Sequence, residues 1–390
     1  MTAMTIPEIN RVCFVGAGTM GCYNAMAAAI SGYHAVLYDV SAQSLARVEQ
    51  TLQDMGAFLA GGGYCLAEDI PGALARITVS DNLEAATANA DLVSESVFER
   101  LDIKREIHAQ LDSVCPTHTI LTTNSSALLV SDIEDVVSRG DKFAALHTHL
   151  GSPLVDIVPG PRTSRPVLET LERYVASTGG VSLLLNKENP GYVLNAMLGP
   201  LLGTALALVL REGASVAAVD AAWMVGQQAP MGPFGMMDLF GVNLIRDTWQ
   251  YRDRSDVLQP MKAQVLELLD PMVERGELGM KAGAGFYRYP EPAYQQTGFT
   301  SASHDQKLHE ALLVALIGNA VILAADEIVE MGDIDRAWTI GTYLAQGPFE
   351  LLRTTGVEPF QIMMREAVQS QRLDLARATK ISQWLAQRFT

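Results

Sequence analysis

The sequence predicts an α/β region with a doubly wound parallel sheet, followed by an all-α region of two homologous helical domains. Short apolar strands alternate with helical stretches in the first part of the chain, the pattern of a parallel sheet covered by helices. From about Asn189 the strands stop, and the rest of the chain reads as helices. The helical part also repeats a set of motifs at one constant offset, which indicates an internal duplication.

Five predicted strands form the sheet, each a short apolar run between helical stretches. They are Arg11–Val15, Ala35–Tyr38, Asp91–Val93, Ile120–Thr123 and Lys142–Leu146. Amphipathic runs between the strands, such as Ser41–Leu59 and Asp102–Leu111, are predicted to be helices. The alternation of the two patterns predicts parallel pairing of the strands.

The duplication rests on residues that recur 115 positions later in the chain. Asp220, Trp223, Gly226, Gly232-Pro233-Phe234 and Gly241-Val242 return as Asp335, Trp338, Gly341, Gly347-Pro348-Phe349 and Gly356-Val357. All members keep the same spacing without a gap, which chance does not readily produce. The two helical copies are therefore predicted to be homologous domains.

The repeat also sets the predicted domain boundaries. Residues 1–187 form the α/β domain, 188–293 the first helical copy and 304–390 the second. Tyr289–Ser303, with its Pro, Gln, Gly, Ser and Thr residues, reads as the linker between the copies. Two copies in one chain can bury their apolar faces against each other. We therefore expect Gln306–Thr390 to pack on the first copy, with further oligomerisation left open.

Charge and cysteine usage limit the classes of partner. The chain of 390 residues has a net charge of −16 and a pI of about 4.8, whereas nucleic acid and anionic membranes need a basic face. Its four cysteines have no C-x-x-C spacing, which fits a reducing cytoplasm. No signal-peptide pattern is present, and Asn195 and Pro200 interrupt the uncharged stretch Tyr192–Leu210, which favours a buried helix over a membrane span. We expect a cytoplasmic protein that acts on a small molecule.

A nucleotide-binding motif follows the first strand. Gly16-Ala17-Gly18-Thr19-Met20-Gly21 is a G-x-G-x-x-G between a strand and an apolar helix, the phosphate-binding turn of a Rossmann-type domain. Asp39 ends the second strand 23 residues after Gly16. A carboxylate there accepts hydrogen bonds from the adenosine ribose and repels a 2′-phosphate. The six residues of the motif and Asp39 are therefore predicted to bind NAD rather than NADP.

Further motifs resemble those of one enzyme family. They are Asn124-Ser125-Ser126, Phe143-Ala144-Ala145-Leu146-His147, Asn189-Pro190-Gly191-Tyr192-Val193-Leu194-Asn195, Met231-Gly232-Pro233-Phe234 with Asp238, and Gly283-Ala284-Gly285-Phe286-Tyr287. In this order and spacing they resemble the 3-hydroxyacyl-CoA dehydrogenases over essentially the whole chain. The second helical copy looks like the duplicated C-terminal domain of the multifunctional fatty-oxidation enzymes.

The resemblance implies an NAD-linked oxidation of a secondary alcohol and assigns residues to it. Hydride leaves the alcohol carbon only if the hydroxyl proton leaves too, and a histidine held by a carboxylate suits that task. By resemblance His147 is this base, and Ser126 and Asn195 hydrogen-bond the substrate. Ser126 could instead cap a helix. The same resemblance assigns Glu99, Lys104 and Asn124 to the cofactor site.

The sequence departs from the family just after the histidine. The family usually continues with two aromatic residues and Asn-Pro and has a glutamate twelve residues on, whereas position 159 here is proline. A deletion of three residues in the loop restores the register, with Leu154–Val158 as the family strand and Asp156 in the place of the glutamate. His147 and His149 form a His-x-His pair that could ligate zinc. No third ligand is apparent in the sequence, so no metal is expected.

The surface expected to meet CoA is also unusual. Family members that bind CoA have lysines on a helical hairpin after the second strand, but Val48–Glu99 contains nine acidic residues and one basic residue, Arg76. Such a surface suits a triphosphorylated nucleotide poorly. The substrate is therefore a 3-hydroxyacyl-CoA or, alternatively, a small free hydroxy acid or ring-bearing alcohol. An alternative of another class is a non-catalytic, NAD-binding structural protein, for which the altered loop and carboxylate are the support.

Overall fold

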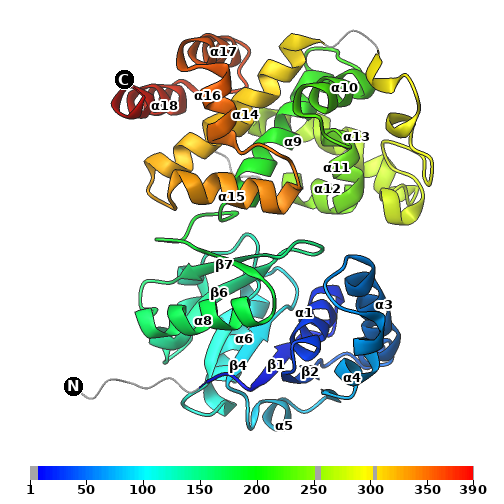
Figure 1. Ribbon diagram of the computed structural model, residues 1–390, viewed down its shortest axis with the longest axis vertical. Coiled ribbons are helices and arrows are strands. Elements are labelled where there is room, and N and C mark those ends of the chain that lie inside the picture. Colours follow the sequence, from blue (N-terminus) through cyan, green and yellow to red (C-terminus); the bar gives the residue numbers. More distant parts are fainter. Residues whose placement is uncertain (1–7, 251–255, 302–304, 390) are drawn as a thin grey trace. The chain divides into compact units, whose positions relative to one another are not determined.

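The computed structural model describes residues 8–250, 256–301 and 305–389, and the chain divides into two compact units (Figure 1). The first unit is the chain up to Val193 together with Glu327–Val329, and the second is the remainder from Leu194 onwards. The predicted boundary after residue 187 therefore falls short of the observed one. Asn186 fixes the added segment, because its backbone N–H donates to Ile328 O (2.8 Å) and its Nδ2 to Glu327 O (3.1 Å).

The first unit contains an eight-stranded sheet in the order β3-β2-β1-β4-β5-β6-β7-β8. The strands are β1 (Arg11–Val15), β2 (His34–Tyr38), β3 (Ile77–Ser80), β4 (Leu92–Glu95), β5 (Ile120–Thr123), β6 (Phe143–Thr148), β7 (Leu154–Pro159) and β8 (Val181–Leu184). All neighbours pair in parallel except β6 and β7. The strand order reverses direction beside β1, and ligands of such sheets bind at the carboxyl ends of the strands there.

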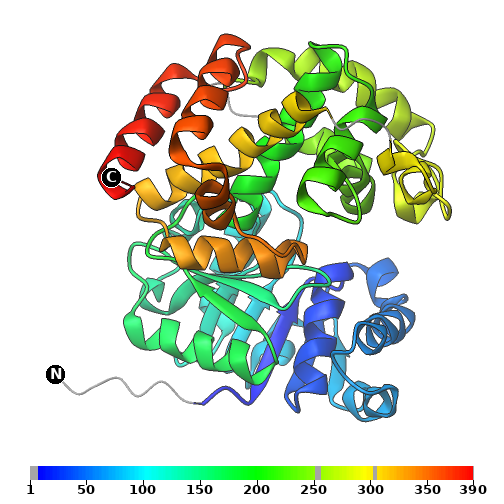
Figure 2. The same ribbon diagram turned by 45° about the horizontal axis from the view of Figure 1, so that its top comes forward.

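Helices cover both faces of this sheet. They are α1 (Thr19–Ile30), α2 (Ala42–Leu45), α3 (Val48–Gly61), α4 (Ile70–Leu74), α5 (Leu83–Thr87), α6 (Leu101–Val114), α7 (Val130–Glu134) and α8 (Arg165–Ser177). Helices α1 and α8 lie on one face (Figures 1 and 2). Helix α1 packs closely because its inner side carries alanines, with Ala25 and Ala28 fully buried. The helix predicted over Ser41–Leu59 is broken near Arg47 into α2 and α3.

The register of the β6–β7 hairpin positions the site. His147 pairs with Asp156 and Ala144 with Pro159, as the gapped alignment of the loop requires. Residues directly opposite in an antiparallel pair point their side chains to the same face of the sheet. The two strands are joined by a short loop, 149–153, in which Gly151 has a φ of +77°. The hairpin therefore holds the imidazole and the carboxylate side by side.

The second unit is helical. Its helices are α9 (Leu194–Leu210), α10 (Val216–Gln227), α11 (Pro233–Phe240), α12 (Val242–Gln250), α13 (Lys262–Glu274), α14 (Gln306–Ala325), α15 (Met331–Thr342), α16 (Pro348–Thr355), α17 (Val357–Gln369) and α18 (Leu375–Arg388). Helix α14 packs along α9 and α10 (Figure 1). The rings of the buried Trp223 and Trp338 lie 6.5 Å apart, between centroids. Both sets of helices thus share one core and form one compact unit.

The repeated motifs occupy matching places in this unit. Helices α15 and α16 begin and end 115 residues after α10 and α11. Asp220 accepts a hydrogen bond from Phe234 N (2.8 Å), and Asp335 accepts one from Phe349 N (2.7 Å). The predicted linker is folded as far as Ser301, with 3-10 turns at Ala293–Gln295 and Phe299–Ser301. Residues 302 and 303 of the linker and Thr390 lie outside the described residues.

One helix is long and apolar enough to cross a membrane by length and composition. Within the described ranges this helix is α14, and 56% of its most apolar stretch of 18 residues is buried inside the protein. The uncharged stretch singled out in the sequence becomes α9, which is mostly buried and contains Pro200. Both helices therefore serve as core helices of the second unit.

Candidate active site

The glycine motif forms the turn from β1 into α1. Gly16 has a φ of +104°, and a Cβ there would lie 2.6 Å from Ser96 O, so only glycine fits. A Cβ on Gly18 would meet nothing within 4 Å, which leaves room for a ligand to approach the backbone. Helix α1 starts at Thr19, and Gly18 offers no side-chain cap. Its first N–H groups and the helix dipole therefore suit a bound diphosphate.

Asp39 holds this turn from the end of β2. Its Oδ2 accepts a hydrogen bond from Ala17 N (2.8 Å), and its Oδ1 accepts one from Ser41 N (2.8 Å). The side chain is half-buried, so its remaining lone pairs can accept hydrogen bonds from ribose hydroxyls. The loop and the carboxylate thus fit an adenosine diphosphate moiety, and the negative charge disfavours a 2′-phosphate.

A buried ion network lies beside β4. Lys104 Nζ contacts Glu95 Oε1 (2.6 Å) and Glu99 Oε2 (3.3 Å), and the side chains of Lys104 and Glu95 are 1% and 0% exposed. Burial alone raises the pKa of Glu95. Hydrogen bonds and positive charge from His108 and Lys104 outweigh that effect and lower the pKa to about 2. Lys104, predicted to line the cofactor site, is instead enclosed here and anchors Glu99.

Glu99 connects the loops after β4 and β5. Its Oε1 accepts hydrogen bonds from Ser126 N (3.0 Å), Ala127 N (3.0 Å) and the hydroxyl of Ser125. Ser125 Oγ in turn accepts from Leu128 N (2.9 Å). Residues 126–128 form a bend, and α7 starts only at Val130 with Leu129 as its N-cap. The helix cap considered as the alternative for Ser126 is therefore not made. The Ser126 side chain is half-buried.

Asn124 connects the ends of β5 and β6. Its Oδ1 accepts hydrogen bonds from Thr148 N (2.8 Å) and Thr148 Oγ1 (3.1 Å). Thr148 directly follows His147, so Asn124 fixes the backbone at the carboxyl end of β6. This is a positioning contact, and the direct cofactor contact assigned to Asn124 stays a prediction.

His147 and Asp156 meet as the gapped register predicts. His147 Nδ1 lies 2.9 Å from Asp156 Oδ2, and the two residues are 6% and 0% exposed. Burial lowers the pKa of His147 below 6.5, and the neighbouring His149 lowers it further. The hydrogen bond and negative charge of Asp156 oppose these effects. Burial raises the pKa of Asp156, but the two histidines outweigh it and bring the pKa to about 2. A neutral imidazole beside an ionised carboxylate is the result.

His149 contacts the same carboxylate. Its Nε2 lies 2.9 Å from Asp156 Oδ2, and its ring meets that of His147 edge-on at 4.4 Å between centroids. This contact was not predicted, although His149 directly follows β6 and continues the alternation that places it on the same face as His147. The sequence showed no third metal ligand beside the His-x-His pair. The structure adds a candidate, because Asp156 places a third ligand-type atom within 4.8 Å of the other two.

Two exposed apolar side chains flank the predicted cofactor residues. Val40 directly follows Asp39 and is 81% exposed, and Phe98 directly precedes Glu99 and is 80% exposed. Neither residue was predicted from the sequence, although a large apolar residue beside a predicted cofactor ligand was an available signal. Exposed apolar surface at such a place suits contact with a ring of the ligand. Asn195, by contrast, lies half-buried in the first turn of α9 in the second unit, and its substrate contact stays a prediction.

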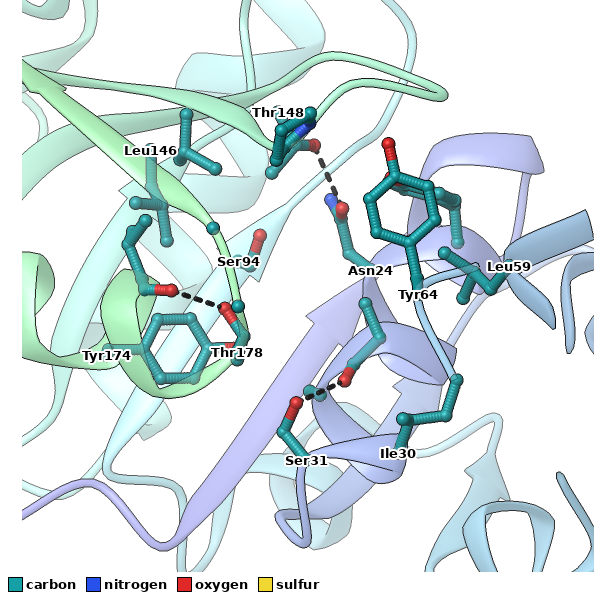
Figure 3. Close-up of a pocket in the computed structure, with 18 of the residues that line it drawn as sticks. Asn24, Ile30, Ser31, Leu59, Tyr64, Ser94, Leu146, Thr148, Tyr174 and Thr178 are labelled. Atoms are coloured by element: carbon teal, nitrogen blue, oxygen red, sulfur yellow. Dashed lines mark hydrogen bonds between the residues drawn. The ribbon is translucent and has the colours of Figure 1, made fainter. Parts of the chain in front are cut away.

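A separate cleft opens on the face of the sheet covered by α1 and α8 (Figure 3). Its volume is about 800 Å³, solvent at its mouth included. Leu146, Thr148 and Val155 contribute to its wall. Side chains alternate between the faces of a strand, so His147 and Asp156 point away from this cleft. The cleft is therefore distinct from the dyad.

Comparison with known proteins identifies the family. Residues 11–188 match the NAD binding domain of 3-hydroxyacyl-CoA dehydrogenase, and residues 191–289 match its C-terminal domain. The mitochondrial hydroxyacyl-coenzyme A dehydrogenase of Sus scrofa is 32% identical over 293 residues, which cover 72% of this chain and 91% of that one. The chain belongs to the 3-hydroxyacyl-CoA dehydrogenase family.

Solved structures of similar proteins agree with this family. A diketoreductase, described as acting on dicarbonyl compounds, is 32% identical, with a TM-score of 0.67, 73% of this chain covered and 100% of that one. The 3-hydroxybutyryl-CoA dehydrogenase of Escherichia coli K12 is 21% identical, with a TM-score of 0.79 and coverage of 98% and 99%. The second likeness is one of fold, and it extends through the helices after residue 289.

Membership of the 3-hydroxyacyl-CoA dehydrogenase family identifies the class of reaction. The protein is an NAD-dependent oxidoreductase that acts on a CH–OH group. The turn at Gly16–Gly21 and the carboxylate of Asp39 fit that cofactor by geometry. The expectations of fold, cofactor and reaction class drawn from the sequence are therefore confirmed.

Proposed function

We propose that His147 is the general base in the NAD-linked oxidation of a 3-hydroxyacyl compound. The observation that carries this proposal is the buried contact of 2.9 Å between His147 Nδ1 and Asp156 Oδ2. When the ring is neutral, Nδ1–H donates to the carboxylate and Nε2 keeps its lone pair. Nε2 is then the atom that takes the proton from the substrate hydroxyl.

The surrounding charges support this assignment. The pKa of His147 lies below its usual value because of burial, so the ring is neutral and ready to accept a proton near pH 7. The ionised Asp156 stabilises the imidazolium that forms. NAD, when bound, supplies the acceptor for the hydride. In this proposal Ser126 and Asn195 bind the substrate oxygens, and Glu99 faces the cofactor from the position that Lys104 fixes.

The substrate is proposed to lack the CoA nucleotide or to be held mainly by its acyl part. Between Val48 and Glu99 the single basic residue is Arg76, and its Nη1 donates to Ala29 O (3.4 Å) rather than standing free. The tip of α3 offers the hydroxyl of Tyr64, which donates to Gly151 O (3.2 Å). Such a surface has little to offer three phosphates. The diketoreductase relative supports small dicarbonyl-type substrates, whereas the names of other relatives favour acyl-CoA.

A paired screen tests both parts of this proposal. NADH formation is followed with matched 3-hydroxyacyl-CoA thioesters and free 3-hydroxy acids, and binding of free CoA is measured by calorimetry. We expect activity with the free or truncated compounds and weak binding of CoA. Submicromolar binding of CoA would overturn the substrate proposal, and absence of turnover with every compound would favour the non-catalytic alternative.

We further propose that the second unit consists of two tandem copies of one helical domain. Matching boundaries of α10 with α15 and of α11 with α16 support a duplication. The C-terminal family model ends at residue 289, so α14–α18 supply the added copy. A cytoplasmic location is proposed from the cysteines, which are all free in the described residues.

A further inference from the structure

The side chains around Asp156 offer more than a dyad needs. A general base requires one carboxylate oxygen to orient its imidazole, yet a second imidazole, that of His149, converges on the same oxygen. The ligand-type atoms of His147, His149 and Asp156 all lie within 4.8 Å of one another. Two imidazole nitrogens and one carboxylate oxygen form the donor set of many zinc sites that keep an open position.

We propose that His147, His149 and Asp156 bind a divalent transition-metal ion of the zinc type, and that this ion switches the dehydrogenase off. Binding stands on the geometry alone, whereas the inhibition rests on the proposed role of His147 as base.

Two of the three distances between ligand atoms are close to those that such an ion requires. Ligand atoms bound at about 2.0–2.1 Å in a tetrahedron lie about 3.3 Å apart. Both nitrogen-to-oxygen distances in the cluster are 2.9 Å, so each has to open by only a few tenths of an ångström. The nitrogens have to approach each other, and His149 stands at the start of the loop 149–153, where backbone adjustment is easiest.

A second observation points to a ligand at this place. Asp156 Oδ1 is fully buried and has no hydrogen-bond partner among the described residues. A buried carboxylate oxygen without a donor is unfavourable, and a nearby cation would offset that cost. The side chain of His149 is 12% exposed, so it offers an ion a route from solvent to the carboxylate.

Inhibition follows from the placement of one proton. In the metal-free site the neutral His147 carries its proton on Nδ1, facing Asp156, and Nε2 is the base. An ion on Nδ1 requires the proton to move to Nε2. Each ring keeps one proton, but Nε2 of His147 becomes a donor and no longer accepts the hydroxyl proton. The ion therefore abolishes the base without occupying the space of the substrate.

Metal binding is tested first, by measurements that do not depend on enzyme activity. ZnCl2 is titrated by calorimetry into EDTA-treated protein, and Co²⁺ absorption reports a tetrahedral nitrogen and oxygen environment. H149F removes one ligand, and H149Q removes it while keeping a donor to Asp156, in case H149F does not fold. H118F is the matched control, since His118 also faces an aspartate, Asp91, at 3.3 Å but at the surface. We expect one Zn²⁺ per chain in the wild type and H118F, and binding at least about tenfold weaker in H149F and H149Q.

Activity then tests the inhibition. Each variant is compared with itself, with buffered Zn²⁺ and after EDTA. We expect buffered Zn²⁺ to lower the rate of wild type and H118F at least about tenfold, and EDTA to restore it. The rates of H149F and H149Q should change little between the two conditions. Unchanged binding in both His149 variants, or no binding by wild type, would overturn the site. Tight binding at His149 without inhibition would instead contradict His147 as the base, which separates the two failures.

Discussion

Asp156 is the residue on which the dyad depends. The sequence leaves two registers after His147, and the one without a gap places Pro159 at the position of the carboxylate. Proline has neither a carboxylate nor an N–H and cannot orient an imidazole. In the structure Pro159 pairs with Ala144, and Asp156 pairs with His147. Strand pattern and chemistry together were therefore sufficient to find this pair.

Other residue contacts could not be found in this way. The burial of Lys104 depends on Glu95, a residue of another element, and the second hydrogen bond of Asp156 depends on where the ring of His149 turns. Sequence patterns report which face a residue occupies, but not which partners tertiary packing brings to it. The resemblance therefore assigned Lys104 to the cofactor site, and the contact of His149 with Asp156 was not predicted.

Asp39 is predicted to set the preference for NAD. Its carboxylate lies against the glycine turn at Ala17 N, where it is placed to accept hydrogen bonds from the ribose diol and to repel a phosphate on it. Asp39→Ala is expected to weaken NAD binding and to reduce discrimination against NADP by at least about tenfold, the scale of one charged hydrogen bond. Fluorescence titration with both cofactors measures this. Equal turnover of NAD and NADP by the unaltered enzyme would refute the assignment.

The pKa of His147 predicts the pH dependence of the two reaction directions. Burial places this pKa below 6.5. Alcohol oxidation needs the neutral ring, so its kcat/KM should rise with pH through that pKa and then level off. Carbonyl reduction needs the protonated ring, so its kcat/KM should fall as the pH rises through the same pKa. Rates measured across pH in buffers with EDTA test this, and an inflection well above 6.5 would contradict a buried base.

At the scale of elements, apolar runs predicted the buried strands well. The five strands proposed from the sequence are present, because each is buried between layers of helices. Arg11–Val15 and Ile120–Thr123 have the predicted bounds, and the other three have shifted ends. Strands β3 and β8 were missed. Each has only four residues, and most of those residues are partly exposed, so neither run stands out from its surroundings. The break between α2 and α3 also lacks a glycine or proline to mark it.

The β1–α1 turn permits a test of cofactor binding that leaves the fold alone. Gly18→Ala adds a methyl group where the protein leaves open space, so the melting temperature should change little. The same methyl group should block the close approach of the diphosphate and weaken NAD binding by more than about tenfold. Gly61→Ala is the matched control, since it also meets no atom within 4 Å. Unchanged NAD affinity in Gly18→Ala would contradict the assignment of this turn.

For the whole molecule, the sequence predicted the order of the α/β region and the helical regions along the chain. It did not predict which of these regions pack into one compact unit. The change from strands to helices and the repeat at a constant offset are properties of the chain itself. The grouping depends on contacts across the repeat, such as the packing of α14 on α9 and of Trp338 beside Trp223. These contacts join the helices of the two proposed copies into one compact unit.

Removal of residues 304–390 tests this shared core. The deletion uncovers the apolar sides of α9 and α10, including the ring of Trp223, which is 0% exposed. We expect the shortened protein to aggregate or to form a new dimer, because association buries a large exposed apolar patch. Light scattering and thermal melting check this. A monomer as soluble and heat-stable as the full chain would refute the idea.

The turnover of the Asp156→Asn enzyme tests whether Asp156 activates His147. The amide preserves shape but loses the charge and the preference for a proton on Nδ1. NAD binding should stay intact, since no cofactor residue is altered, and His147→Gln serves as the reference for loss of the base. We predict that Asp156→Asn lowers kcat by a factor of about ten to a thousand. Full turnover by Asp156→Asn with wild-type NAD affinity would show that His147 does not depend on Asp156.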